Sequence, residues 1–83
     1  MEALSLKERA QMLTSSLVWG GAKTFEQIKE LDWLKTTSEY GIYWYIREAE
    51  NYGWIKTTVY ADTSKPNLYL ATAKGRKMAE ERD

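Results

Sequence analysis

Residues 36–55, TTSEYGIYWYIREAENYGWI, constrain the fold most strongly, because they carry a helical apolar stripe that stops at a glycine. The stripe consists of residues three or four positions apart: Ile42, Tyr45, Ile46 and Ala49. This spacing places side chains on one face of a helix. Gly53 stands where a left-handed residue is expected to end that helix. The sequence therefore predicts a helix over about residues 37–52 whose aliphatic face turns towards a core.

The opposite face of this helix carries rings where a surface helix usually carries Glu and Lys. At 100° per residue it comprises Tyr40, Tyr43, Trp44, Arg47 and Asn51. We expect this face to contact a partner. In an alternative arrangement the helix is rotated by a few tens of degrees and buries one or two of the rings. Burial of all three rings is not expected, because the aliphatic stripe already supplies a core face.

After Gly53 the apolar period changes to two, which predicts a β-hairpin over residues 55–71. The residues of its first strand predicted to face the core are Ile55, Thr57 and Val59. Residues 61–67 are polar, contain the single proline and are predicted to form the loop. Residues 68–71 return as the second strand. Two short strands alone are marginally stable, so the hairpin is expected to lie against the helices.

Three further helices are predicted to begin at hydroxyl side chains. Two of these hydroxyls belong to capping boxes, Ser5 with Glu8 and Thr24 with Gln27. They predict helices over residues 5–18 and 24–31, with a very short strand at residues 22–23. Thr72 is predicted to cap a last helix over residues 73–82. The order helix, helix, helix, hairpin, helix predicts an α+β winged helix-turn-helix in a single domain over residues 1–83, with the hairpin as the wing.

Composition narrows the functional classes. A chain of 83 residues has room for one modest core. It contains no Cys and no His, so thiolate metal sites, disulfides and the commonest general base are absent. No apolar run approaches the length of a membrane span, and the first residues lack the basic-then-apolar pattern of a signal peptide, so neither is expected. We expect a cytoplasmic protein without cofactor, metal or enzymatic activity. Three tryptophans are expected to pack structurally: Trp19, Trp33 and Trp54.

The charges are balanced in number and unevenly placed. Lys and Arg together count 12, as do Asp and Glu. Residues 53–77 carry five basic side chains against Asp62 alone, a balance of +4, whereas residues 38–52 carry Arg47 against three Glu, a balance of −2. The basic surface is therefore predicted in the C-terminal third, next to a mildly acidic helix.

From residue 42 to residue 76 the chain resembles winged-helix transcription regulators of the MarR and PadR type. Their third helix ends in a pattern close to Leu-x-x-Leu-Glu-x-x-Gly-Leu-Ile, matched here by Ile46, Ala49, Glu50, Gly53, Trp54 and Ile55. Their wing returns through Tyr-x-Leu-Thr-x-Lys-Gly-Arg, matched here by Tyr69, Leu70, Ala71, Thr72, Ala73, Lys74, Gly75 and Arg76. Ala71 is the one departure from the second pattern. The third helix is more aromatic and acidic, and the last helix shorter, than is usual in these families.

The resemblance implies binding of double-stranded DNA, with the third helix in the major groove and the wing along the backbone. The helix residues that would face the groove are Thr37, Ser38, Tyr40, Tyr43, Trp44 and Arg47. Lys56 at the base of the wing and Lys65 at its tip would meet phosphates. The implied role is transcription regulation, with a homodimer on a symmetric site. The competing hypothesis is a protein-interaction winged helix, because a neutral, ring-rich face also suits a protein interface.

Overall fold

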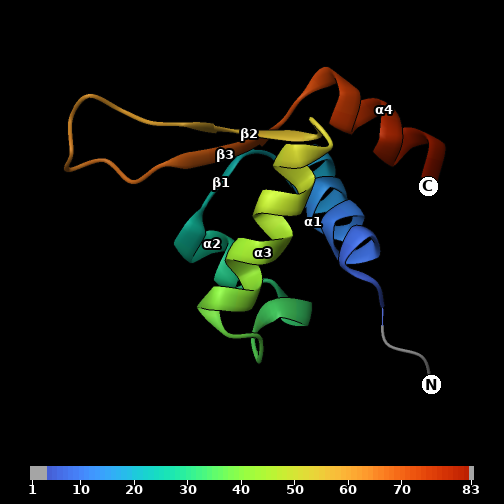
Figure 1. The fold of residues 1–83 in the computed structure, drawn as a ribbon. Coiled ribbons are helices and arrows are strands. Elements are labelled where there is room, and N and C mark those ends of the chain that lie inside the picture. Colours follow the sequence, from blue (N-terminus) through green and yellow to red (C-terminus); the bar gives the residue numbers. More distant parts are fainter. Residues whose placement is uncertain (1–3, 83) are drawn as a thin grey trace.

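The protein is described by a computed structural model over residues 4–82. Within this range it is a small α+β fold of four α-helices, a short 3-10 helix and a three-stranded antiparallel sheet (Figure 1). The elements in chain order are α1 (Leu6–Gly20), β1 (Lys23–Thr24), α2 (Phe25–Lys29), η1 (Asp32–Leu34), α3 (Glu39–Asn51), β2 (Ile55–Thr58), β3 (Leu68–Ala71) and α4 (Ala73–Arg82).

The first two helices begin where their capping boxes predict. The Ser5 hydroxyl accepts the Glu8 amide at 3.1 Å, and the Ser5 amide donates to the Glu8 carboxylate at 3.1 Å. Thr24 and Gln27 make the same reciprocal pair at the start of α2. Helix α1 runs two residues further than predicted, to Gly20, because the left-handed residue that ends it is Gly21, with φ of 86°.

One hydrophobic core joins α1, α3 and the sheet. The inward face of α3 is the predicted aliphatic one, with Ile42, Ile46 and Ala49 buried and Tyr45 partly buried against them. They pack with α1 residues that include Leu13 and Leu17. The orientation of α3 follows from this burial, because the helix turns its aliphatic stripe out of water.

The sheet has the order β1-β3-β2, so the predicted hairpin gains a third strand from the segment before α2. Lys23 pairs with Tyr69, and Thr57 pairs with Tyr69 from the other side. Beyond the sheet the hairpin projects away from the helices (Figure 1). The prediction that Val59 faces the core is wrong, since β2 ends at Thr58 and Val59 is 71% exposed.

The start of helix α4 is fastened to the segment that joins α3 to β2. The Thr72 hydroxyl caps it by accepting the Gly75 amide at 3.0 Å, as predicted, while the Thr72 amide donates to the Trp54 carbonyl at 2.8 Å. A Cβ on Gly75 would collide with that same carbonyl oxygen, so only glycine allows this close approach. Trp54 is buried as predicted.

The other two tryptophans behave differently from each other. Trp33 is partly buried and stacks on Tyr45, with ring centroids 6.2 Å apart. Trp19, in contrast, is 57% exposed and lies at the surface of α1, outside the core. Leu17 and Val18 occupy the inward positions of the last turn of α1, and the next residue lies 100° further around the helix.

Candidate nucleic-acid interface

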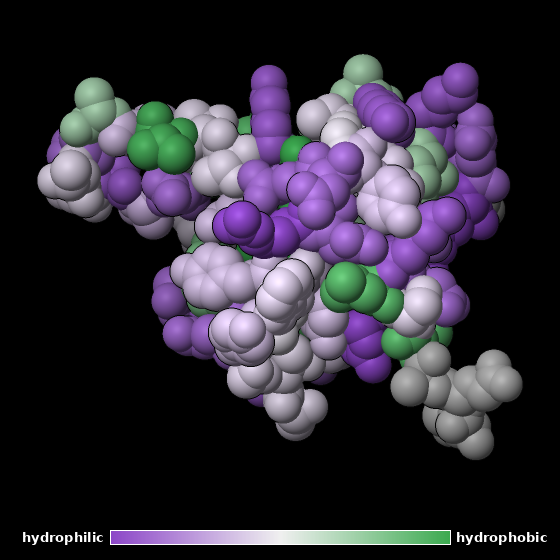
Figure 2. Space-filling view, in the orientation of Figure 1, coloured by the Kyte–Doolittle hydropathy of each residue, from purple (hydrophilic) through white to green (hydrophobic). Residues whose placement is uncertain are grey.

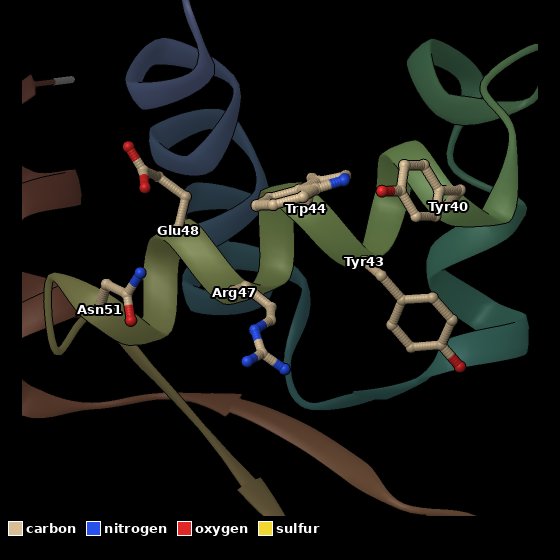
Figure 3. A pocket seen from close by; sticks show the side chains of 6 residues that line it. All are labelled: Tyr40, Tyr43, Trp44, Arg47, Glu48 and Asn51. Atoms are coloured by element: carbon tan, nitrogen blue, oxygen red, sulfur yellow. The ribbon is translucent and has the colours of Figure 1, made fainter.

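The side of α3 turned away from the core is exposed and aromatic, as the helical spacing predicts. Tyr40 is 72% exposed, Tyr43 48% and Trp44 51%. These rings and three polar neighbours line a surface groove (Figure 3). We call this surface the outer face of α3; its residues are Tyr40, Tyr43, Trp44, Arg47, Glu48 and Asn51. All six belong to one helix, so the groove is a shallow track along α3 and not a chamber between elements. Such a surface suits an extended partner.

The rings of the outer face are held by other rings. Tyr43 stacks on Phe25 of α2, with centroids 4.4 Å apart and planes at 10°. Tyr40 and Trp44 meet edge to face, with centroids 6.0 Å apart and planes at 81°. Because these contacts already restrict the rings, a partner has less conformational entropy to remove on binding.

Arg47 is the cation of this face. Its guanidinium points to the hairpin side of α3, whereas the neighbouring Glu48 carboxylate points to the opposite side (Figure 3). Within residues 4–82 no carboxylate lies in ion-pair distance of Arg47. The guanidinium is exposed, and its five N–H donors are available to a phosphate, a base edge or a carboxylate.

Two of the three glutamates of α3 are engaged by neighbours at its edges. Glu39, in the first turn, accepts from the Lys29 ammonium at 2.6 Å. This hydrogen bond raises the pKa of Lys29 against the opposing effect of desolvation. Glu50, near the last turn, accepts from the Thr57 hydroxyl at 3.0 Å. These contacts tie α3 to α2 at one end and to the hairpin at the other.

Tyr69 of β3 is buried in the core beneath the hairpin strands and α3. Burial raises the pKa of the Tyr69 phenol, and the nearby Tyr43 and Glu50 raise it further. In the space-filling view, pale side chains gather over α3, bordered by strongly hydrophilic ones towards the hairpin (Figure 2). The outer face, with its three rings, is thus bordered by hydrophilic side chains towards the hairpin, and its Arg47 guanidinium points to the same side.

The hairpin carries the two lysines predicted to meet phosphates. Lys56 is exposed on β2 and lies on the face of the sheet opposite the buried Ile55, because neighbouring residues of a strand alternate. In the loop, the Lys65 ammonium lies 5.5 Å from the centre of the Tyr60 ring. Asp62 folds this loop by accepting from the Ser64 amide at 2.9 Å and its hydroxyl at 2.7 Å, which lowers the pKa of Asp62.

The structure brings half of the eight predicted residues together. These four are Tyr40, Tyr43, Trp44 and Arg47. Ser38 lies just before α3, where its hydroxyl accepts the Gly41 amide at 3.1 Å and caps the helix. Thr37 is partly buried, with its methyl group close against Gly41. Their positions suit the start of the helix, and the two lysines of the hairpin lie apart from the groove.

Two residues of this surface were not among those predicted, whereas Asn51 lines the groove on the predicted outward face. Glu48 also lines the groove, and helical spacing alone reveals it, since it lies four positions after Trp44. Phe25 supports Tyr43 from another helix, and no local pattern indicates that contact. The interface is therefore wider than the predicted set and depends on α2.

Within residues 4–82, no group of three His, Cys, Asp or Glu residues could hold a metal ion. None of the helices there combines the length and apolar character of a membrane span. Comparison of the chain with protein-family models, curated proteins and solved structures gave no match.

Proposed function

We propose that this chain is a winged helix-turn-helix domain that binds double-stranded DNA and regulates transcription. Helix α3 lies in the major groove, and the β2–β3 hairpin is the wing that follows the backbone. The observation that carries the proposal is the exposed outer face of α3, whose guanidinium points towards a projecting hairpin that bears two lysines. A duplex that meets α3 can then meet both parts of the chain.

The topology supports this assignment. Three helices precede a hairpin, and a short strand between the first two helices joins the sheet beside it. The segment that resembles MarR and PadR regulators also has a structural explanation, since Thr72 and Gly75 fasten α4 against the Trp54 carbonyl. That segment therefore supports the fold, whereas DNA contact depends on α3 and the hairpin.

The chemistry of each side chain assigns its role. Arg47 is the reader of a guanine, because its planar fork matches the two acceptors that guanine presents in the major groove. Tyr40, Tyr43 and Trp44 contact base edges and thymine methyl groups, with Thr37 and Ser38 at the phosphates beside the helix start. Lys56 and Lys65 contact backbone phosphates and add affinity without sequence preference.

Titration of duplex DNA at two salt concentrations tests the proposal. With about two to four phosphate contacts per protomer, affinity should fall roughly 10- to 150-fold between about 50 and 200 mM salt. Arg47→Ala and Lys65→Ala should each weaken binding. Lys77→Ala is the matched control, because Lys77 is an exposed cation on α4, away from both the outer face and the hairpin. An equal loss in all three variants would mean that binding follows total charge and not this surface.

A second candidate function is protein recognition by the same face. Its support is the composition of the outer face, which has three aromatic rings and no net charge, because Arg47 offsets Glu48. Protein interfaces are enriched in aromatic residues and Arg. The titration separates the two functions, because absence of duplex binding at low salt favours the protein module.

As a regulator of this kind the chain would act in the cytoplasm as a homodimer on a symmetric site, each copy placing α3 in one half-site. Sedimentation of the free protein, repeated with duplex DNA, tests this part. Two copies on one duplex support it, and one copy per duplex at saturation contradicts it.

A further inference from the structure

Duplex binding does not explain why the rings on the outer face of α3 expose so much of their flat aromatic surface. Tyr40 and Trp44 stand one helical turn apart and form an open corner, because one ring meets the other edge-on. Tyr43 has one side covered by Phe25, and about half of its surface is exposed. Each ring is therefore held in place while presenting aromatic surface to solvent.

A duplex cannot use this aromatic surface fully. Paired bases stack on one another, so a helix in the major groove meets only base edges and thymine methyl groups. An unpaired base exposes its π-face and stacks on an aromatic side chain. The arrangement of Tyr40 and Trp44 thus fits an unstacked base better than a paired one: a base lying on one ring would have the other ring at its edge.

The charges of this surface lead to the same ligand. Single-strand binding sites combine a few cations that follow the backbone with rings on which bases stack. Here Arg47 lies beside the rings, and Lys56 extends the positive charge onto the hairpin. Two carboxylates oppose this charge: Glu39 is paired with Lys29 and so repels a strand less, and the Glu48 carboxylate points to the side of α3 away from Arg47 (Figure 3). A strand that follows the hairpin side of the track therefore meets the cations.

We infer that the outer face of α3 binds single-stranded DNA, with unpaired bases stacked on Trp44 and Tyr40 and phosphates held by Arg47. The inference rests on the proposed function only in placing nucleic acid on α3. The same surface could hold a locally opened duplex, but its preferred ligand is the unpaired strand.

Two labelled probes test the inference by fluorescence anisotropy: an oligothymidylate of about 16 nucleotides and a mixed-sequence duplex of the same length. The single strand should bind more tightly than the duplex at equal salt. Trp44→Leu should weaken single-strand binding by roughly 5- to 160-fold, which corresponds to the loss of about 1–3 kcal/mol when a stacking ring is removed. Trp44→Phe keeps a ring and should stay within about threefold of wild type.

Trp19→Leu is the matched control. It makes the same chemical change at a tryptophan of similar exposure that lies on α1, outside the groove. Circular dichroism melting of each variant shows whether it is folded, so a loss of binding by a folded Trp44→Leu protein reports on the ring. Wild-type affinity in the control and weakened binding in Trp44→Leu support the inference.

The two probes separate this inference from the proposed function. Tight duplex binding with weaker single-strand binding overturns the inference and leaves the duplex regulator intact. Single-strand binding without duplex binding supports the inference and removes the duplex function. Single-strand affinity that is unchanged in Trp44→Leu overturns the stacking role, and binding of neither probe overturns both proposals.

Discussion

The two faces of α3 differ in burial and in the contacts that hold their side chains. On the inner face Ile46 is 2% exposed, and it is held by a core to which α1, α3 and the sheet contribute. On the outer face Tyr40 is 72% exposed, and its ring is in contact with Trp44. The inner face stabilises the fold through burial, whereas the outer face is shaped by a few neighbours and exposes its rings.

The difference shows why one helix can serve two purposes. Burial of the inner face fixes the rotation of α3 about its axis, so the outer face needs no contact with a core to be presented. Its residues are then free to be selected for a partner. Substitutions on the inner face should therefore lower the free energy of unfolding, whereas substitutions on the outer face should weaken binding and leave stability nearly unchanged.

The largest effect is expected from Ile46→Ala. Removing a buried Ile side chain loses its transfer free energy and leaves a cavity, so the free energy of unfolding should fall by about 2–5 kcal/mol. Trp44→Ala, only two residues away but about 200° around the helix and so on the outer face, should cost less than about 1 kcal/mol. Urea denaturation followed by circular dichroism measures both. Equal losses would mean that the two faces do not differ as the burial indicates.

A smaller effect, on binding alone, is expected from Arg47→Lys. The substitution keeps the charge and removes the planar fork, so sequence-specific duplex affinity should fall by about 1–3 kcal/mol while the salt slope is retained. Stability should remain within about 0.5 kcal/mol of wild type, since Arg47 is exposed. Anisotropy titrations with a selected site and a scrambled duplex measure the change. A loss that is equal on both duplexes would assign Arg47 to phosphate contact.

The features that the sequence predicted well depend on local chemistry. The spacing of Ile42, Ile46 and Ala49 was sufficient to orient α3, because a helix with one aliphatic stripe has one favourable rotation. The capping boxes at Ser5 and Thr24 located two helix starts, because their donors and acceptors lie only three residues apart in the chain. Strand β3 was predicted with its observed bounds.

The features that could not be predicted depend on segments that meet only in three dimensions. The pairing of β1 with β3 joins residues more than forty positions apart, as in Lys23 with Tyr69. The stacking of Phe25 on Tyr43 depends on the angle between α2 and α3. Periodicity also gave no end point for β2, so Val59 was predicted to face a core that stops before it. The groove follows partly from spacing, whereas its support does not.

An effect of about 1 kcal/mol is expected from Ser38→Ala, which removes the N-cap on which both faces of α3 depend. The Ser38 hydroxyl accepts the Gly41 amide, and alanine leaves that amide without this acceptor. Thr36→Ala is the matched control, because Thr36 is an exposed hydroxyl residue just outside the helix. It should change the free energy of unfolding by less than about 0.5 kcal/mol. Similar losses in the two variants would move the cap away from Ser38.

The smallest effect concerns the ion pair at the edge between the two faces, where Lys29 donates to Glu39 and lies 3.7 Å from Glu26. The pair raises the pKa of Lys29 above its ordinary value of 10.5, so the folded state holds this proton more strongly than the unfolded state does. Its stabilisation is fully present below pH 10.5 and is lost as pH rises through the raised pKa of the folded state. The difference in urea midpoint between wild type and Lys29→Met should therefore shrink between about pH 9 and pH 12. Tyrosine ionisation acts on both proteins, so the difference isolates Lys29. A constant difference across this range would show that Lys29 acts through the packing of its aliphatic stem and not through its charge. Lys29 would then stabilise the fold by burial, as the residues of the inner face do.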